Sequence, residues 1–206
     1  EAVFALRQNF HILIIDDNSP DGTATIVKSL FPKYGDSLFL EEREGKLGLG
    51  TAYIFGFRWA LARGYQYIFE MDCDFSHNPA DLDKLYRACK MGGADVAVGS
   101  RYVKGGKVKN WPSIRVNLSK GASVYTRFIT LMPVKDPTAG FVCYTSNVLE
   151  TINLDKISFV GYAFQIEMKF ASWKLGFKIK EVPITIIERK YGVSKMNKGI
   201  VKEVIF

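Results

Sequence analysis

Short apolar runs alternate with longer amphipathic stretches along most of the chain. Runs rich in β-branched and aromatic residues predict strands at residues 10–15, 37–42, 65–71, 94–100 and 140–145. Stretches with helical spacing predict helices at residues 24–31, 48–64, 78–93, 115–132 and 161–176. This alternation predicts an α/β fold, with a mostly parallel central sheet flanked by helices on both faces.

The alternation weakens after Arg101. Residues 102–113 form a long polar segment with two glycines, the kind of loop that often carries function. Residues 177–188 read as an extended segment broken at Pro183, and residues 189–199 as a basic loop.

Size and composition indicate one globular domain. The 206 residues are enough to bury a core, and 48% apolar with 24% charged residues is ordinary for such a domain. No apolar run approaches the roughly 20 residues that span a bilayer, and no signal peptide is visible. We expect a single soluble domain over residues 1–206.

The cysteines suggest neither a disulfide framework nor a zinc site. The three cysteines are an odd number without C-x-x-C spacing, and the two histidines are not clustered with them. This pattern is typical of a reducing compartment.

Charge is distributed unevenly along the chain. Residues 1–103 hold 11 Lys/Arg and 14 Asp/Glu, whereas residues 104–206 hold 17 and 7. The first half therefore supplies most carboxylates that can hold a metal, and the second half most cations that can hold phosphate. A solvated basic face remains the alternative, and no nucleic-acid motif accompanies the cations.

Polar motifs follow three of the predicted strands. "DDNSPD" follows the first, "DCD" follows residues 65–71, and "GSR" ends the strand at 94–100. Ligands of open α/β sheets bind beyond the carboxyl ends of the strands, so we expect these motifs to form one site.

The acidic pair of "DCD" is the strongest single signal. Asp72 and Asp74 are two residues apart at a strand end, so their carboxylates lie on one side and repel each other. A divalent cation relieves this repulsion, and oxygen ligands suit Mg²⁺ or Mn²⁺. A solvated or helix-capping turn is the alternative. A phosphohydrolase of the haloacid dehalogenase type, with Asp72 as nucleophile, is a further one.

Other polar residues have weaker signals. Asp17, perhaps with Asp16, can accept hydrogen bonds from a nucleotide base or ribose, whereas Asp21 fits a capping turn. Lys46 lies in a glycine-rich segment that lacks P-loop spacing and is more typical of a tight turn with close helix packing. We interpret His77 as a surface or capping residue.

Several cations are candidates for binding phosphate, because such charges stabilise a leaving diphosphate. They are Arg101, Arg115, Lys120, Arg189 and Lys195. Arg101 is the best of them because it directly follows a strand. Glu167 can be either a general base or a paired structural carboxylate.

Seven segments, in this order, resemble one family: "IIDDNSPDGT", "REGKLGLGTAY", "MDCDFSHNP", "GSRYVKGG", "DPTAGF", "GYAFQIEM" and "RKYGVSKM". The chain is similar to the dolichol-phosphate (polyprenol-phosphate) mannose synthases, within family 2 of the inverting GT-A glycosyltransferases. The resemblance implies a GT-A fold with a Rossmann-like nucleotide and metal half at residues 1–103 and an acceptor half at 104–206. It also implies a first nucleotide-binding strand, with a P-x-Y-N-E motif, that precedes this chain.

The resemblance also implies roles for individual residues. Asp16 and Asp17 would contact the base or ribose of GDP-mannose. Asp72 and Asp74 would bind Mg²⁺ or Mn²⁺, with Ser76 near the metal where other members carry Gln. Arg101, Arg115 and Arg189 would surround the two phosphate groups, with Lys195 close by. Gln165 and Glu167 would lie near the sugar or acceptor.

The expected activity is metal-dependent transfer of mannose from GDP-mannose to a polyprenyl or dolichyl phosphate, with inversion. We expect the protein to lie peripherally at the cytoplasmic face of a membrane, with no nucleic-acid partner. A UDP-sugar donor and a non-catalytic sugar-nucleotide-binding module remain alternatives. Residues 118–132 could lay an apolar face on the membrane, or they could form an ordinary core helix.

Overall fold

The computed structural model describes residues 1–6 and 9–188. The strands are β1 (Ile12–Asp16), β2 (Leu38–Glu42), β3 (Tyr67–Glu70), β4 (Val96–Ser100), β5 (Lys107–Lys109), β6 (Val142–Thr145), β7 (Ile179–Pro183) and β8 (Thr185–Ile187). The helices are α1 (Thr23–Ser29), α2 (Phe31–Tyr34), η1 (Gly35–Ser37), α3 (Leu49–Ala62), α4 (Asp81–Lys90), α5 (Ser113–Thr130), α6 (Ser146–Thr151), η2 (Leu154–Lys156) and α7 (Phe164–Lys174).

The central sheet has four strands in the order β3-β6-β4-β7. β6 pairs antiparallel with both β3 and β4, and β7 pairs parallel with β4. Three of these strands therefore point the same way, which confirms the mostly parallel sheet. β6 is the exception, and the apolar run at 140–145 carries no signal of its direction.

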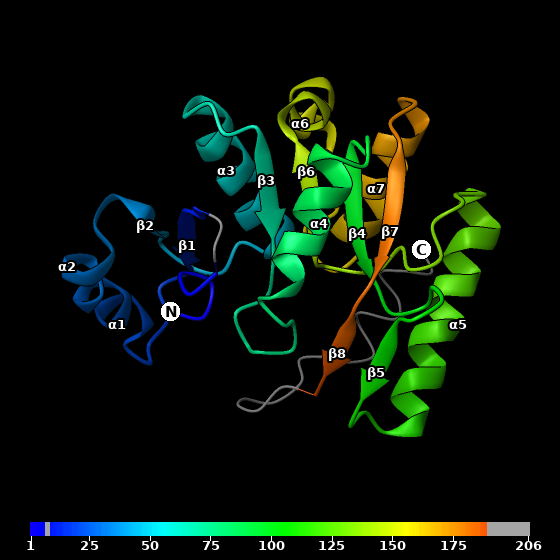
Figure 1. Ribbon diagram of the computed structural model, residues 1–206, viewed down its shortest axis with the longest axis horizontal. Helices are drawn as coiled ribbons and strands as arrows, with labels where there is room; N and C mark the ends of the chain where they lie inside the picture. The colour runs from blue at the N-terminus through cyan, green and yellow to red at the C-terminus, as the bar shows by residue number, and fades with distance from the viewer. Residues whose placement is uncertain (7–8, 189–206) are drawn as a thin grey trace.

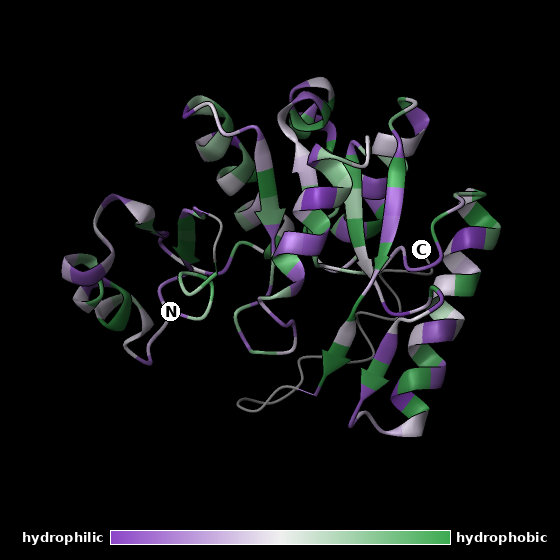
Figure 2. Cartoon of the chain, in the orientation of Figure 1, coloured by the Kyte–Doolittle hydropathy of each residue, from purple (hydrophilic) through white to green (hydrophobic). Residues whose placement is uncertain are grey.

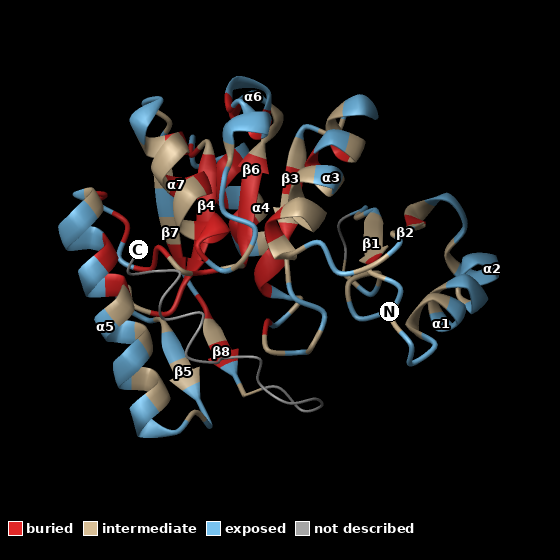
Figure 3. Cartoon of the chain, turned by 180° about the vertical axis from the view of Figure 1, so that it is seen from behind, coloured by how far each residue is buried: buried red, intermediate tan, exposed pale blue. Residues whose placement is uncertain are grey.

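Helices cover both faces of this sheet, as expected (Figure 1). Val96, Val98 and Tyr144 face a core shared with α3, α6 and α7. Ala97 and Cys143, one residue away in each strand, face a second core with α4. This alternation of side chains is what a sheet buried on both faces requires. Figure 2 shows the apolar strands, and Figure 3 shows that β4 and β6 are buried.

β1 and β2 form a separate parallel pair, which lies with α1 and α2 at one side of the molecule (Figure 1). An apolar cavity of about 650 Å³ lies between β1 and β3, lined by residues of both strands and of α3. Within the described residues, β1 pairs only with β2 and β3 only with β6. The two strands therefore line the same cavity without pairing with each other.

The segment at 102–113 contains a strand that the sequence pattern does not indicate. β5 pairs parallel with β8, and its two lysines are exposed while Val108 is half-buried. A three-residue strand with one apolar side chain has no recognisable period. The expected break at Pro183 is confirmed, because it separates β7 from β8.

Within residues 1–6 and 9–188, no helix has both the length and the apolar character needed to cross a bilayer.

Candidate active site

Polar motifs gather at one edge of the central sheet. β3 and β4 run in the same direction, so Glu70 and Ser100 end at the same edge. Asp72 and Asp74 follow β3, and Arg101 follows β4. The acidic turn and the arginine are therefore brought to one side of the sheet, as the strand-end argument predicts.

The acidic turn has a defined local structure. Asp72 is exposed and Asp74 is half-buried. The backbone N–H of Ser76 donates to Asp74 Oδ1 at 3.0 Å, and Phe75 lies in the left-handed region with φ 62°. Such an Asx turn fixes the direction of the Asp74 carboxylate.

The turn creates a negative field around itself. Burial and then the charge of Asp72 raise the pKa of Tyr53, which reaches the turn from α3. The same two causes, in the same order, raise the pKa of Cys73. Burial raises the pKa of Glu70 to about 7, opposed by Lys169 and reinforced by Asp72. A cation bound here would be attracted by this field.

The described residues offer few side-chain ligands for a metal ion at this turn. Across the residues that the structure describes, no group of three or more His, Cys, Asp or Glu side chains is arranged to hold a metal ion. Among these residues, the acidic turn itself offers the carboxylates of Asp72 and Asp74. Mg²⁺ commonly binds through one or two carboxylates together with water and substrate phosphates, so this set fits a metal that the substrate helps to hold.

His77 is buried, so its interpretation as a surface or capping residue is wrong. Its ring lies 4.9 Å from that of Phe141, and only 4% of the residue is exposed. Burial lowers its pKa to about 4; Asp74 opposes this change and Arg101 reinforces it. His77 is therefore a neutral ring between the acidic turn and the arginine.

His77 is expected to make the fold sensitive to acid. Its pKa in the folded protein lies below the ordinary value of 6.5, so the unfolded chain takes up the proton first. Its contribution is complete above about pH 6.5 and is lost as the pH falls toward about 4, by up to about 3 kcal/mol. Urea unfolding at about pH 7.5 and about pH 4.5 should show a smaller loss in His77→Phe than in the wild type. Equal losses in the two proteins would contradict this role.

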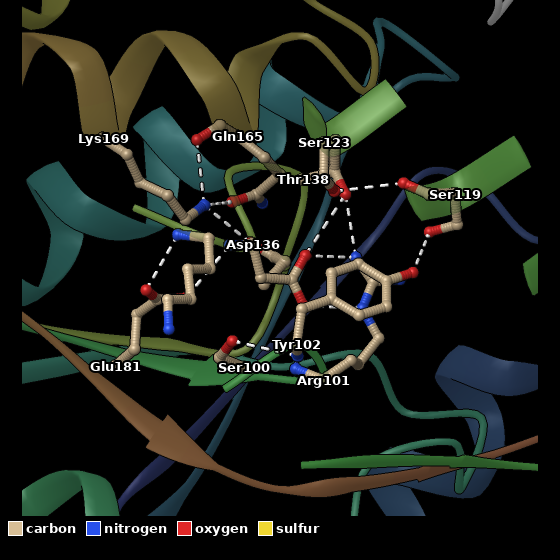
Figure 4. A network of polar contacts seen from close by, with 12 residues as sticks. Ser100, Arg101, Tyr102, Ser119, Ser123, Asp136, Thr138, Gln165, Lys169 and Glu181 are labelled. Atoms are coloured by element: carbon tan, nitrogen blue, oxygen red, sulfur yellow. Dashed lines mark hydrogen bonds and ion pairs between the residues drawn. The ribbon is translucent and has the colours of Figure 1, made fainter. Parts of the chain in front are cut away.

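Arg101 is held by Asp136 (Figure 4). Its Nε donates to Asp136 Oδ2 at 2.7 Å and its Nη2 to Oδ1 at 2.5 Å, and its backbone N–H also donates to Oδ2. Nη2 donates as well to Thr138 Oγ1 at 2.8 Å. Both charged side chains are buried. Burial alone would lower the pKa of Arg101, but the bonds and charge of Asp136 raise it.

Trp111 brings Arg115 next to Arg101. The Arg115 guanidinium lies 3.8 Å from the Trp111 ring centre, and that of Arg101 lies 5.7 Å from it. Arg115 Nη1 donates to both carboxylate oxygens of Glu188, at 2.6 and 2.5 Å. Arg101 and Arg115 therefore contact the same ring, with Asp136 and Glu188 as their counter-ions, and their expected roles around phosphate stay predictions.

β8 connects the acidic turn to this arginine cluster. The backbone N–H of Ile187 donates to Ser76 O at 3.2 Å. The next residue, Glu188, holds Arg115. Ser76 lies two residues after Asp74, and its hydrogen bond with Ile187 therefore joins the acidic turn to the segment that positions Arg115. The carboxylates and the arginines belong to one continuous site.

Asp17 has a protein partner that the sequence interpretation did not identify. Arg43 Nε donates to Asp17 Oδ1 at 2.6 Å, and Arg43 Nη1 donates to Thr51 Oγ1 at 2.9 Å. Asp16 is buried and accepts from the backbone N–H of Ser19. The end of β1 is thereby tied to the start of α3.

The glycine-rich segment serves close packing. A Cβ atom at Gly50 would lie 2.6 Å from Phe159 O, and one at Gly48 would lie 2.7 Å from Val160 O. The Gly50 N–H donates to Val160 O at 2.8 Å. Lys46, just before these glycines, is exposed.

Glu167 fixes the same segment from the other side. Its carboxylate accepts from the backbone N–H groups of Ser158, at 2.9 and 3.0 Å, and of Phe159, at 2.9 Å. These contacts favour the structural alternative for Glu167 over a general base.

Gln165 belongs to a buried network around Lys169 (Figure 4). Lys169 Nζ donates to Ala139 O at 2.6 Å, to Gln165 O at 2.9 Å and to Gln165 Oε1 at 3.2 Å. Burial lowers the pKa of Lys169 to about 8, opposed by Glu70. Lys169, held by Gln165, thus joins α7 to the segment that contains Asp136.

Sequence reasoning missed the partners of the candidate residues. Asp136 and Thr138 lie in the quoted "DPTAGF" segment and Arg43 in "REGKLGLGTAY", but no local pattern assigns them to Arg101 and Asp17. Lys169 lies four residues after Gln165 on α7, and this spacing is the one local signal that could have revealed it. Arg189 and Lys195 lie outside the described residues, so their expected roles stay predictions.

Comparison with known proteins identifies the family of the chain. A family model described as glycosyl transferase family 2 matches residues 1–152. The chain is 46% identical to a polyprenol monophosphomannose synthase from Mycolicibacterium smegmatis, over 95% of this chain and 74% of that protein. It is 44% identical to an undecaprenyl-phosphate mannosyltransferase from Micrococcus luteus, over 94% and 79%.

Solved structures with low sequence identity share the fold. Glucosyl-3-phosphoglycerate synthase from Mycobacterium tuberculosis, in complex with phosphoglyceric acid, has a TM-score of 0.66 at 16% identity, with 95% of this chain and 66% of that chain covered. A mannosyltransferase from Pyrobaculum calidifontis, in complex with GDP-Man and Mn²⁺, has a TM-score of 0.55 at 14% identity, with 95% and 51% covered. The chain thus spans about two thirds or less of these two structures.

Proposed function

Because the chain belongs to glycosyl transferase family 2, we propose that it transfers mannose from GDP-mannose to a polyprenyl phosphate, with inversion at the sugar. The observation that carries the proposal is the continuous site in which the Asp72–Asp74 turn meets the Arg101–Trp111–Arg115 cluster. Carboxylates suit the metal of a metal–diphosphate complex, and the arginines suit phosphate oxygens. The names of the two curated relatives support the lipid phosphate as acceptor.

The acceptor supplies its own nucleophile in this reaction. A phosphate oxygen attacks C1 of mannose, the C1–O bond to the diphosphate breaks, and GDP carries away the electron pair. A phosphate monoester has its second pKa near about 6, so the attacking oxygen is already ionised at neutral pH. The reaction therefore needs no strong general base, and attack opposite the diphosphate inverts C1.

Asp72 and Asp74 would hold Mg²⁺ or Mn²⁺, and the remaining ligands would be water and diphosphate oxygens. After burial, which is the main cause, the charge of Asp72 raises the pKa values of Tyr53 and Cys73, and this negative charge supports the fit. When bound, the metal neutralises charge on the leaving diphosphate. Arg101 and Arg115 would lie beside it, with their guanidinium groups already oriented by Asp136 and Glu188.

Glu167→Gln is expected to retain activity, within about tenfold of the wild type, because no base is needed. The amide oxygen of Gln can still accept from one of the two backbone N–H groups that Glu167 holds. Transfer rates to a polyprenyl phosphate would be compared with those of Glu150→Gln, an exposed carboxylate on α6. Complete loss of transfer in a folded Glu167→Gln protein would restore the general-base role.

The proposed function is tested by incubating the full chain with labelled GDP-mannose, a polyprenyl phosphate and Mg²⁺ or Mn²⁺. Label in the lipid phase is the expected result, and none should appear after chelation of the metal. A parallel reaction with UDP-glucose separates the two donors. Binding of GDP without transfer would favour a non-catalytic module and contradict the proposal.

Membership of this family sets aside the phosphohydrolase alternative, in which Asp72 would be a nucleophile. A lipid-linked acceptor lies in a bilayer, so the proposed transfer requires the protein to work at a membrane surface; its location at the cytoplasmic face stays a prediction.

A further inference from the structure

α5 is amphipathic, but unlike a core helix it buries polar side chains and exposes apolar ones. Its buried side carries hydroxyl groups: Ser123 and Thr126 are buried, and Tyr102 donates to Ser119 Oγ at 2.7 Å. Its other side, here called the α5 outer face, is apolar and exposed. This face consists of Ile114, Leu118, Val124, Tyr125, Phe128 and Ile129.

The α5 outer face is a continuous stripe. Ile114, Leu118, Tyr125 and Phe128 follow one another at helical spacing, so they lie on one side of the helix. Ile114 is 72% exposed and Phe128 is 78% exposed. The helix stands at the edge of the molecule beside β5 (Figures 1 and 3). At about 1.5 Å per residue, the stripe from Ile114 to Ile129 on α5 extends over about 24 Å. The core-helix alternative from the sequence is therefore wrong for this side of α5.

The surroundings of the stripe are cationic. Residues 104–135 contain seven Lys/Arg and no Asp/Glu. Six of these cations are exposed: Lys104, Lys107, Lys109, Lys120, Arg127 and Lys135. An apolar stripe with a basic surround matches a bilayer with anionic head groups. A second copy of the same face would bring like charges together.

The helix that carries this face also carries a residue of the candidate active site. Arg115, on the inner side of α5, contacts Trp111 and Glu188. A bilayer against the outer side would therefore hold a lipid-linked phosphate close to the arginine cluster. We propose that the α5 outer face docks on the surface of a bilayer containing anionic lipids, an inference that rests on the proposed transfer to a lipid phosphate.

The test is co-sedimentation of the full chain with vesicles of phosphatidylcholine, with and without phosphatidylglycerol. We expect binding to the anionic vesicles that weakens as salt is raised. The double variant Phe128→Ser with Ile129→Ser should bind at least about tenfold more weakly. The double variant Lys120→Glu with Arg127→Glu should weaken binding by about fivefold or more for each cation that is replaced. Because all four side chains are exposed, circular dichroism and Tm should not change.

The matched control is Ile26→Ser with Met91→Ser, which removes two equally exposed apolar side chains outside α5. It should bind like the wild type. Equal binding of the wild type and the Phe128 and Ile129 variant would overturn the proposal. So would a wild-type dimer in size-exclusion chromatography that this variant dissociates, since the occupant would then be a second copy.

The vesicles carry neither donor nor acceptor, so this outcome does not depend on transfer. Transfer to a short, water-soluble prenyl phosphate without vesicles measures the proposed function alone, and the Phe128 and Ile129 variant should match the wild type there. With an acceptor embedded in anionic vesicles, the same variant should lose about tenfold in rate. An equal loss with both acceptors would overturn the docking role.

Discussion

Asp74→Ala is expected to lower transfer by at least about a thousandfold, because a metal that stabilises the leaving diphosphate contributes several kcal/mol to the transition state. The fold should survive, since Asp74 is only half-buried. The measurements are the transfer rate and Mn²⁺ binding in the absence of substrate, by calorimetry.

Asp74→Asn separates the metal role from the turn. The amide oxygen can still accept from the Ser76 N–H, but the carboxylate charge is gone. If Asp74 is a metal ligand, Asp74→Asn should be nearly as inactive as Asp74→Ala and should bind Mn²⁺ weakly. Recovery of most activity in Asp74→Asn would show instead that only the shape of the turn matters.

Arg101→Ala should have a large effect on stability as well as on activity. It leaves the Asp136 carboxylate buried without its cation, and breaking a buried pair in this way costs about 3–5 kcal/mol. We also expect weaker donor binding or a much lower turnover, because the arginine cluster would lose one member. Urea unfolding gives the first effect, and steady-state kinetics with GDP-mannose gives the second.

The double variant Arg101→Ala with Asp136→Ala distinguishes the two effects. Removing both charges should restore much of the lost stability, because no isolated buried charge remains. Activity should stay low if Arg101 acts on phosphate. If activity returned together with stability, Arg101 would have a structural role only.

Most of the framework of the site could be predicted from local patterns. The apolar runs gave the strands of the central sheet, and the polar motifs at their ends gave the edge where Asp72, Asp74 and Arg101 gather. Such signals depend on the period of the side chains and on short motifs, which are present in the chain before it folds.

The partners could not be predicted, because they are distant in sequence. Asp136 is 35 residues from Arg101, Glu188 is 73 from Arg115, and Arg43 is 26 from Asp17. No local pattern states which carboxylate meets which guanidinium. β6 also pairs with strands that are distant in sequence, so its antiparallel direction could not be predicted from local patterns.

Sequence alone determined the longer helices and the strands of the central sheet, the acidic turn and the basic second half, because each depends on residues close together in the chain. Folding decided which side of each element faces the interior. It turned His77 inward against Phe141, and it turned the apolar side of α5 outward over a hydroxyl-lined contact. The helical period of α5 fixes that its apolar residues share a side, but only packing against the rest of the molecule decides whether that side meets protein or solvent.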